Sequence, residues 1–338
     1  MATLTDHQLG MVAESTYGTA PVVTRFLQML ESTKMDFDPM PLQGVGMTVG
    51  APGGVNRADR RIVGIGKGSG TLNVEAISKG LGVLLNASAG TATSTLVSGT
   101  TFQQNYTPTV ANTLLPSIAV QLGIVDNTGT VNAHTYAGCS VGGFTLACPE
   151  AGIATLSADI DAKSLSTAVA LATASYAANA SLFSFVGGTI TLGGAVTVPT
   201  TTAIGVGGTA NSNVRSWELT SSNTIDDGRW IIGGRNQPTV GKRKHSLKFK
   251  YEYNDNTVRT NLLAQSSVSF TATHITTEAL STGFATLQLV VPAMKINPGS
   301  LPEPTLGETV ITDVDAEILW DGTNQPFYIV IRTADSAL

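Results

Sequence analysis

Charged side chains are scarce in this sequence. Asp, Glu, Lys and Arg make up 13% of its 338 residues, whereas about 25% is usual in soluble domains. Two stretches, residues 80–125 and 164–214, contain none of them. A chain that exposes so little charge must bury part of its surface. The candidates are a membrane, an aggregate, or further copies of the same chain.

Long apolar runs are also missing. A membrane-spanning helix needs about 20 consecutive apolar residues, and Gly, Thr, Ser, Asn and Pro interrupt both neutral stretches every few positions. We therefore expect no membrane insertion. Residues 1–10 contain Asp6 and His7 and lack the basic-then-apolar pattern of a secretory signal. We expect the chain to remain in the cytoplasm of the cell that makes it.

The sequence also contains few cysteines and has no net positive charge. Cys139 and Cys148 are too few for a disulfide framework, and we expect two buried thiols in a reducing compartment. The formal net charge is −5. This sign does not suit a protein that holds DNA by neutralising phosphates.

Glycine and strand-like alternation are abundant. The 36 glycines and many Ser and Thr residues favour turn-rich β structure. Apolar and polar residues alternate in many segments, as in half-buried antiparallel strands. These segments include 117–123, 144–148, 155–161, 189–192, 215–219, 245–253, 268–273, 286–291, 309–319 and 327–332. We predict a mainly β chain, folded as a single elaborated domain over residues 1–338.

Two further elements complete the predicted fold. Ile77, Leu81, Leu84 and Leu85 fall at helical spacing and predict one helix over about residues 76–87, with one apolar face packed on a sheet and Gly90 as its end. Residues 1–60 are punctuated by Gly and Pro and predict an extended N-terminal arm. Residues 165–180 suit either a helix or a loop or edge strand.

No catalytic or metal site emerges. Gly138-Cys139-Ser140-Val141-Gly142 matches G-x-S-x-G, but a strand pattern follows it where a nucleophile elbow requires a helix. The four histidines are scattered, so we expect surface or interface residues, and His134, Cys139 and Cys148 lack zinc spacing. We predict neither an enzyme nor a cofactor.

Acidic residues alternate on two predicted strands. Asp159 and Asp161 share one strand face, and Asp313, Asp315 and Glu317 share another. Either these are ordinary solvated faces, or they line an acidic channel. A calcium site would need oxygen ligands from other segments.

Basic residues cluster at the start of one predicted strand. The cluster consists of Lys242, Arg243, Lys244, Lys248 and Lys250. One interpretation is an edge strand that lysines guard against aggregation. Alternatively, the patch meets the acids of a neighbouring copy, and self-association then weakens at high salt.

The order of several motifs resembles the major tail tube proteins of long-tailed bacteriophages, particularly those that infect actinobacteria. The similar segments begin with Ala13-Glu14-Ser15-Thr16-Tyr17-Gly18-Thr19-Ala20-Pro21. They continue with Gly70-Thr71-Leu72-Asn73-Val74-Glu75 and residues 79–85, 182–185, 188–194, 214–223 and 233–245. The neutral tract over 164–214 is less familiar, and we expect an outer hairpin or insertion there.

This resemblance implies a β-sandwich with a flanking helix. Six copies would form a ring whose strands close a barrel, and the rings would stack into a tube in the virion tail. The tape-measure protein would fill the lumen before DNA passes through it. Tail terminator and distal tail or baseplate proteins would be further partners, and the family favours a flexible tail without a sheath. An acidic lumen, from Asp159, Asp161, Asp313, Asp315 and Glu317, would let DNA slide. The alternative function is a β-sandwich adhesin or decoration module that binds host glycans.

Overall fold

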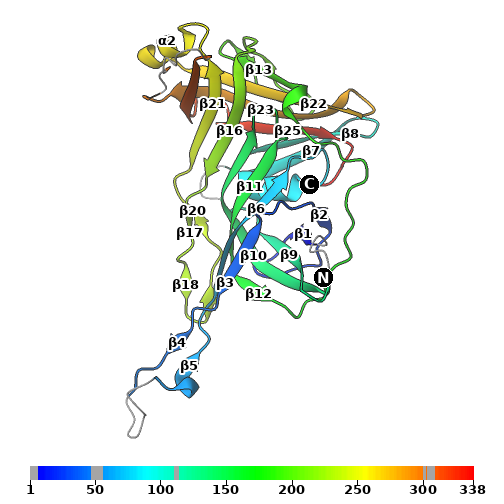
Figure 1. Ribbon diagram of the computed structural model, residues 1–338, viewed down its shortest axis with the longest axis vertical. Coiled ribbons are helices and arrows are strands. Elements are labelled where there is room, and N and C mark those ends of the chain that lie inside the picture. Colours follow the sequence, from blue (N-terminus) through cyan, green and yellow to red (C-terminus); the bar gives the residue numbers. More distant parts are fainter. Residues whose placement is uncertain (1–6, 47–55, 110–113, 300–301, 303–308) are drawn as a thin grey trace.

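The computed structural model describes residues 7–46, 56–109, 114–299, 302 and 309–338. The chain is mainly β, as predicted (Figure 1). Two large antiparallel sheets cross each other, and a long hairpin extends from one end of the molecule (Figure 1). We call the sheets the first and the second sheet.

The first sheet contains half of the segments whose sequence alternates. Its neighbouring strands, in order, are β3 (Lys34–Asp38), β6 (Lys67–Glu75), β11 (Thr155–Ala162), β10 (Val131–Cys148), β16 (Val214–Ser222), β21 (Lys244–Glu252) and β24 (Ile311–Ile318). In β24 and β21 every second side chain is buried and its neighbours are more exposed. This period of two places the apolar residues on one face of the sheet.

The second sheet covers that apolar face. Its strands, in order, are β7 (Gly90–Ser98), β8 (Thr101–Pro108), β25 (Tyr328–Thr333), β23 (Phe284–Ile296), β22 (Val268–Ala279) and β13 (Gly188–Leu192). The end of β23 also pairs with β24, which joins the two sheets. The core between them contains fully buried Leu72, Leu219, Leu247 and Leu289. Each such side chain stabilises the fold by about 1.5–3 kcal/mol.

Strand β10 connects this sandwich to a smaller layer. Its second half pairs with β11 and β16, and its first half pairs with β9 (Ile118–Val125) and β12 (Ser164–Ser166). Strand β9 in turn pairs with β1 (Gln8–Ala13), which pairs with β2 (Arg25–Leu27). The register of β10 against β9 shifts between Tyr136 and Cys139.

The predicted helix is shorter and lies later in the chain than expected. Helix α1 spans Gly82–Ala89, and Gly90 ends it in a left-handed conformation, as predicted. Residues 76–78 are extended, because the amide of Ala76 bonds to Ala154 and that of Ser78 to Ser181. Nearly every α1 residue is buried, so the helix lies inside the fold and has no solvent face.

A second helix, α2 (Thr257–Ala264), was not predicted. Val258 is its only buried residue, so the sequence carries no strong apolar stripe. The carboxylate of Asp255 accepts a hydrogen bond from the amide of Thr257 at 2.8 Å, which satisfies one of the unpaired donors at the helix start.

The extended arm is also more limited than the predicted residues 1–60. Strands β1 and β2 belong to the fold because Leu9, Met11 and Leu27 are buried in the core, and β3 pairs with β6 at the edge of the first sheet. The part that projects is the segment between β3 and β6 (Figure 1). It contains β4 (Leu42–Gln43), β5 (Arg61–Ile62) and the 3-10 turn Ala58–Arg60. We call this segment the long hairpin.

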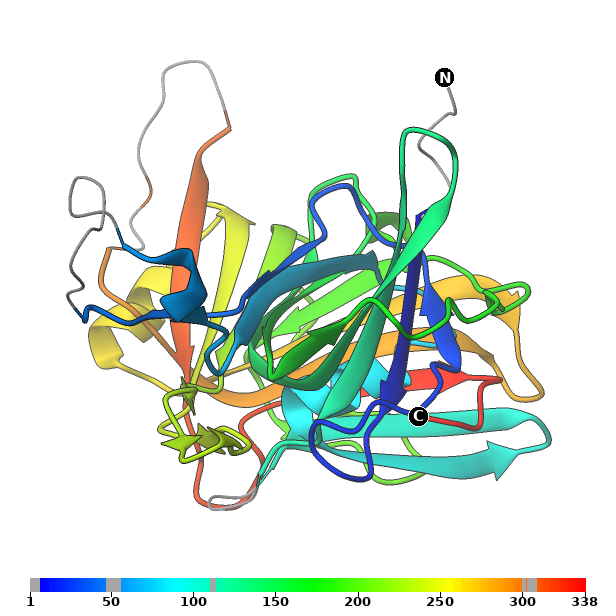
Figure 2. The same cartoon turned by 90° about the horizontal axis from the view of Figure 1, so that it is seen from below.

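A second excursion, the short hairpin segment, joins β16 to β21. It contains β17 (Ile225–Asp226) paired with β20 (Thr239–Val240), and β18 (Trp230–Ile231) paired with β19 (Gly234–Arg235). In Figure 1 it runs along the same side of the molecule toward the base of the long hairpin. In Figure 2, viewed from below, the two excursions lie on the same side of the sheets.

The two neutral stretches differ in burial, because much of 80–125 lies in the core whereas most of 164–214 lies at the surface. Residues 80–125 include α1, β7, β8 and β9, with Leu84, Leu85, Tyr106 and Ile118 in the core. Residues 164–214 include β12, the 3-10 turn Phe185–Gly187, β13, and the pair β14 (Val196–Thr197) and β15 (Val206–Gly207).

Gly138 is expected to be essential to the bend in β10. Its φ is +66°, and a Cβ there would lie 2.7 Å from the Cβ of Lys163 and 3.1 Å from the Tyr17 ring. Gly138→Ala should lower the free energy of unfolding by roughly 2–4 kcal/mol, from left-handed strain plus overpacking. Urea denaturation measures this. The control is Gly193→Ala, where φ is +75° and nothing lies within 4 Å, so only the strain of about 1 kcal/mol remains. Equal losses would contradict the steric argument.

Candidate assembly surface

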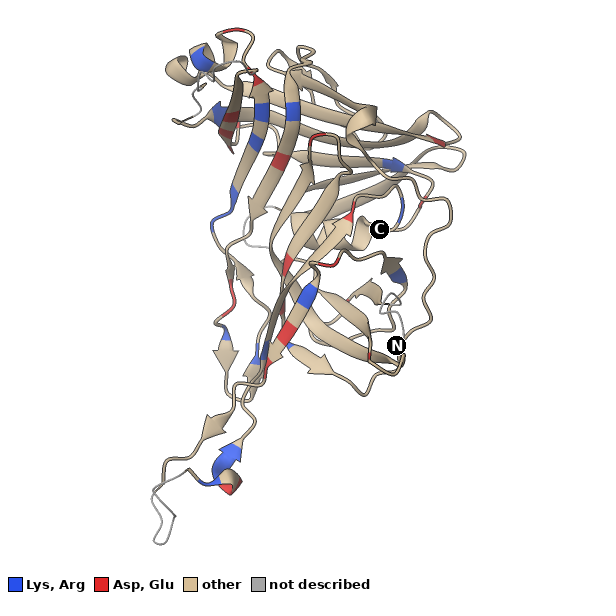
Figure 3. Cartoon of the chain, in the orientation of Figure 1, with Lys and Arg blue, Asp and Glu red and all other residues tan. Residues whose placement is uncertain are grey.

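The outer face of the first sheet carries rows of opposite charge. Lys248 on β21 lies directly opposite Asp315 on β24 and Glu218 on β16. Lys250 lies opposite Asp313. Figure 3 shows blue and red residues alternating across these strands, while the second sheet is nearly free of colour. Since facing side chains on one sheet side are about 5 Å apart at Cβ, each of these lysines is near an acid of its own chain.

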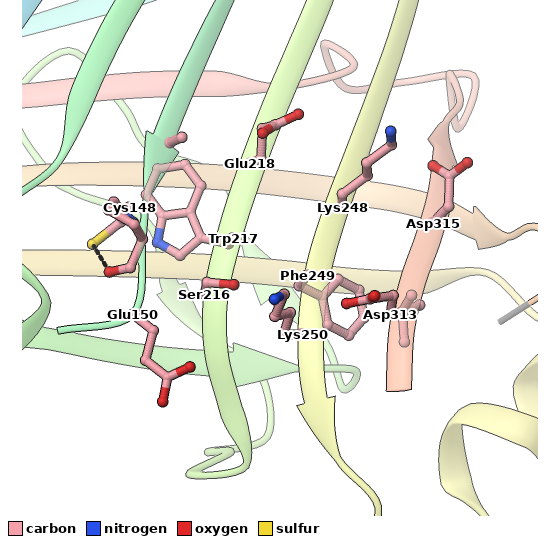
Figure 4. Close-up of a pocket in the computed structure, with 13 residues that line it drawn as sticks. Cys148, Glu150, Ser216, Trp217, Glu218, Lys248, Phe249, Lys250, Asp313 and Asp315 are labelled. Carbon is pink, nitrogen blue, oxygen red and sulfur yellow. Dashed lines mark hydrogen bonds between the residues drawn. The ribbon is translucent and has the colours of Figure 1, made fainter. Parts of the chain in front are cut away.

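A groove runs across this charged face. It has a volume of about 610 Å³ and crosses β10, β16, β21 and β24. Its charged lining residues are Glu150, Glu218, Lys248, Lys250, Asp313 and Asp315. In Figure 4 the side chains of Glu218, Lys248 and Asp315 project in a row from neighbouring strands. Carboxylates outnumber ammonium groups here, so the groove is mixed in charge with acid in excess.

The predicted acidic residues do not all share this surface. Asp313 and Glu317 are exposed, Asp315 is half-buried, and all three lie on one side of β24, as the alternation predicted. Asp159 is exposed on β11 and accepts a hydrogen bond from Thr71 Oγ1 at 3.0 Å. These four residues support the strand-face interpretation.

Asp161 is different and corrects the expectation of a solvated face. Its Oδ2 accepts a hydrogen bond from Arg235 Nη2 at 2.5 Å, and Lys67 Nζ lies 3.9 Å from its Oδ1. Burial raises the pKa of Asp161, while the positive charges of Arg235 and Lys67 oppose this shift. The short hairpin segment, which contributes Arg235, covers Asp161. Strand parity could not reveal this because the covering residue is 74 positions away.

The predicted basic patch is divided among three environments. Lys248 and Lys250 lie in the charged rows. Lys242 and Lys244 are exposed at the start of β21. Arg243 is half-buried and donates a hydrogen bond to the carbonyl of Thr109 at 3.1 Å. Strand β21 pairs with β16 and with β24, so these lysines do not guard an edge strand.

Two histidines lie in the core, where we had expected surface or interface residues. His274 Nε2 accepts a hydrogen bond from the Trp217 indole at 3.0 Å, and its Nδ1 donates to the Ser184 carbonyl at 2.9 Å. His245 Nδ1 lies 2.9 Å from Ser221 Oγ. Burial lowers the pKa of both imidazoles. They are neutral core groups that satisfy buried polar partners.

The serine of the G-x-S-x-G match is 1% exposed in the middle of β10 and lies opposite Asp161. The strand continues past it to Cys148, so the strand–turn–helix arrangement of a nucleophile elbow is not present there. Both cysteines are buried thiols, as predicted. The described residues contain no group of His, Cys, Asp or Glu that could hold a metal ion. The described helices include none long and apolar enough to cross a membrane.

A comparison with protein families decides between the remaining functions. The family model described as "Phage tail tube protein" matches residues 5–322, nearly the whole chain. This chain belongs to the phage tail tube protein family. No curated protein matched the sequence. The family is structural and not enzymatic, and its membership favours a tail protein of the virion over a glycan-binding adhesin.

The buried His245 should make the stability of this tail tube protein depend on pH. Burial, and secondarily the charge of Arg243, lowers its pKa from 6.5 to about 4. Between these values the unfolded chain binds a proton that the folded chain does not. The free energy of unfolding therefore falls as the pH falls from 6.5 to 4, by at most about 1.4 kcal/mol per pH unit from this group.

Urea denaturation from pH 8 to 4 measures this slope. His245→Gln keeps a hydrogen-bonding group near Ser221 and should flatten the slope below pH 6.5. Above that pH neither the folded nor the unfolded chain binds the proton. The free energy of unfolding should therefore depend on pH in the same way in wild type and variant. An unchanged acid slope in the variant would refute the assignment.

Proposed function

We propose that six copies of this chain form a ring and that the rings stack into the tail tube of a long-tailed phage. The tail is flexible and has no sheath. The tape-measure protein fills the lumen, and DNA later passes through it during ejection. Tail terminator and distal tail or baseplate proteins bind the two ends. Assembly takes place in the host cytoplasm. Family membership supports the tube, and the finer statements rest on the resemblance and on the surfaces described above.

The observation that carries this proposal is the open side of the first sheet. Within the described residues β3 pairs with β6 on one side and with no strand on the other. Unpaired backbone groups on such an edge readily pair with another strand. Joining copies into a closed ring removes the exposed edges. One face of the sheet is already covered by the second sheet, which leaves the charged face for the lumen.

The lumen assignment applies to four of the predicted acids, namely Asp159, Asp313, Asp315 and Glu317. A surface with acid in excess repels the phosphate backbone weakly, so DNA slides without sticking. Lys248 and Lys250 limit this repulsion because each faces an acid of its own chain. Asp161 is not assigned to the lumen because its buried carboxylate is paired with Arg235.

The exposed Lys242 and Lys244 are the part of the basic patch that suits a neighbouring copy. If they meet acids of that copy, self-association weakens as salt screens the contact. Sedimentation of the assembled protein across a salt series measures this, and assembly that does not respond to salt would count against the contact.

Electron microscopy of the purified protein in negative stain tests the proposal. We expect tubes or rings with six-fold symmetry. Dispersed monomers at concentrations where tail proteins assemble would instead favour the adhesin or decoration module.

Cysteine labelling of assembled tubes tests the lumen assignment. Glu317→Cys should react with a small maleimide but not with one carrying a large polyethylene glycol, because the bulky reagent cannot enter a long tube. Val206→Cys, 59% exposed on β15 outside the first sheet, is the matched control. The native thiols are buried and give little background. Equal labelling of Glu317→Cys by both reagents would place this strand face on the outer wall.

A further inference from the structure

The tip of the short hairpin segment exposes three apolar residues in succession. Trp230 is 40% exposed, Ile231 50% and Ile232 106%. Three consecutive apolar residues exposed to water are unfavourable unless a partner covers them. Gly233, with φ of +85°, completes the turn between β18 and β19 and holds Ile232 at the outermost position. We call Trp230, Ile231 and Ile232 the apolar tip.

The apolar tip is held rigidly from below. The Arg235 side chain is fully buried and donates hydrogen bonds to the carbonyls of Ala162 and Asp227 and to the carboxylate of Asp161. The Trp230 ring lies over the guanidinium, 5.2 Å from its centre. A two-stranded hairpin of this size is at best marginally stable alone. The buried anchor therefore sets the position of the tip before any partner arrives.

An apolar groove lies toward the other end of the molecule. It has a volume of about 650 Å³, and its lining includes Phe185, Val186, Ile190 and Val214. Val186 is 91% exposed at its rim. Figure 1 shows β13 near the end opposite to β18, so the apolar tip and this groove face different neighbours.

The groove is almost without unpaired charge. Most of its lining comes from the neutral tract 164–214. Its one charged residue, Arg215, already pairs with Glu150 at 2.9 Å and with Glu252 at 3.4 Å. An apolar tip can enter such a groove without leaving a buried charge unpaired.

We propose that the apolar tip of one copy inserts into the Phe185–Val214 groove of a second copy. The apolar tip and the groove are different surfaces of the same chain, so the contact between two copies is heterologous. Such a contact can repeat from copy to copy, as a tube requires. The inference rests on the proposed function only in naming the partner as the same chain. It also assigns a role to the parts of the neutral tract that line the groove, as the receiving surface.

Photocrosslinking tests the contact directly. Benzoylphenylalanine at position 232 should give a covalent dimer under ultraviolet light, with the link mapped by mass spectrometry to residues 185–190 or 210–217 of the second copy. Benzoylphenylalanine at Val206, also exposed, is the control and should not link to that region. No dimer, or a link elsewhere, would overturn the inference.

A substitution tests whether the contact supports assembly. Ile232→Asp should raise the protein concentration needed for assembly at least tenfold, whereas Ile232→Leu should leave it within about twofold. Both variants should unfold at the wild-type temperature because the side chain is outside the core. Assembly of Ile232→Asp at wild-type concentration would overturn the inference while leaving the tube intact. Absence of tubes in wild type would overturn the proposed function, and the crosslink would still decide the contact.

Discussion

The backbone pairing of β10 is the constraint on which the fold depends. This strand bonds to β9, β12, β11 and β16 along its length, so one segment joins the first sheet to the smaller layer that contains the N-terminal strands. Buried amides and carbonyls must find partners, and a straight strand could not serve all four neighbours. The register shift at Gly138 lets β10 leave one layer and enter the next. Glycine is required there by its positive φ and by the side chains of Lys163 and Tyr17.

Side-chain amides explain how a chain with so little charge covers its sheets. Gln121 bonds to the backbone of Ala170 and Ala172, and Gln288 bonds to both the amide and the carbonyl of Gly205. These buried glutamines hold the neutral tract against the sheets. A neutral amide satisfies a peptide group without the desolvation cost of an ion. Part of the missing surface charge is thus accounted for within one copy.

Alternation in the sequence predicted most strands because β11, β21 and β24 each have one face in the core. It failed where tertiary contacts override local pattern. Residues 76–78 fit a helix but are extended, since partners at Ala154 and Ser181 occupy their amides. His245 and His274 look like scattered polar residues, yet each bonds a buried group from another strand. Asp161 shares parity with Asp159 but is covered by a distant segment.

The Arg235–Asp161 pair connects the two candidate surfaces. A buried ion pair seldom adds net stability compared with apolar residues of the same size. Its value here is geometric, because it fixes the short hairpin segment against β11 and so positions Trp230 and Ile232. The same contact removes Asp161 from the row of acids on the first sheet. This ion pair therefore lies at the boundary between the charged face and the apolar tip. In a chain with few charged residues, two of them are used to fix this boundary.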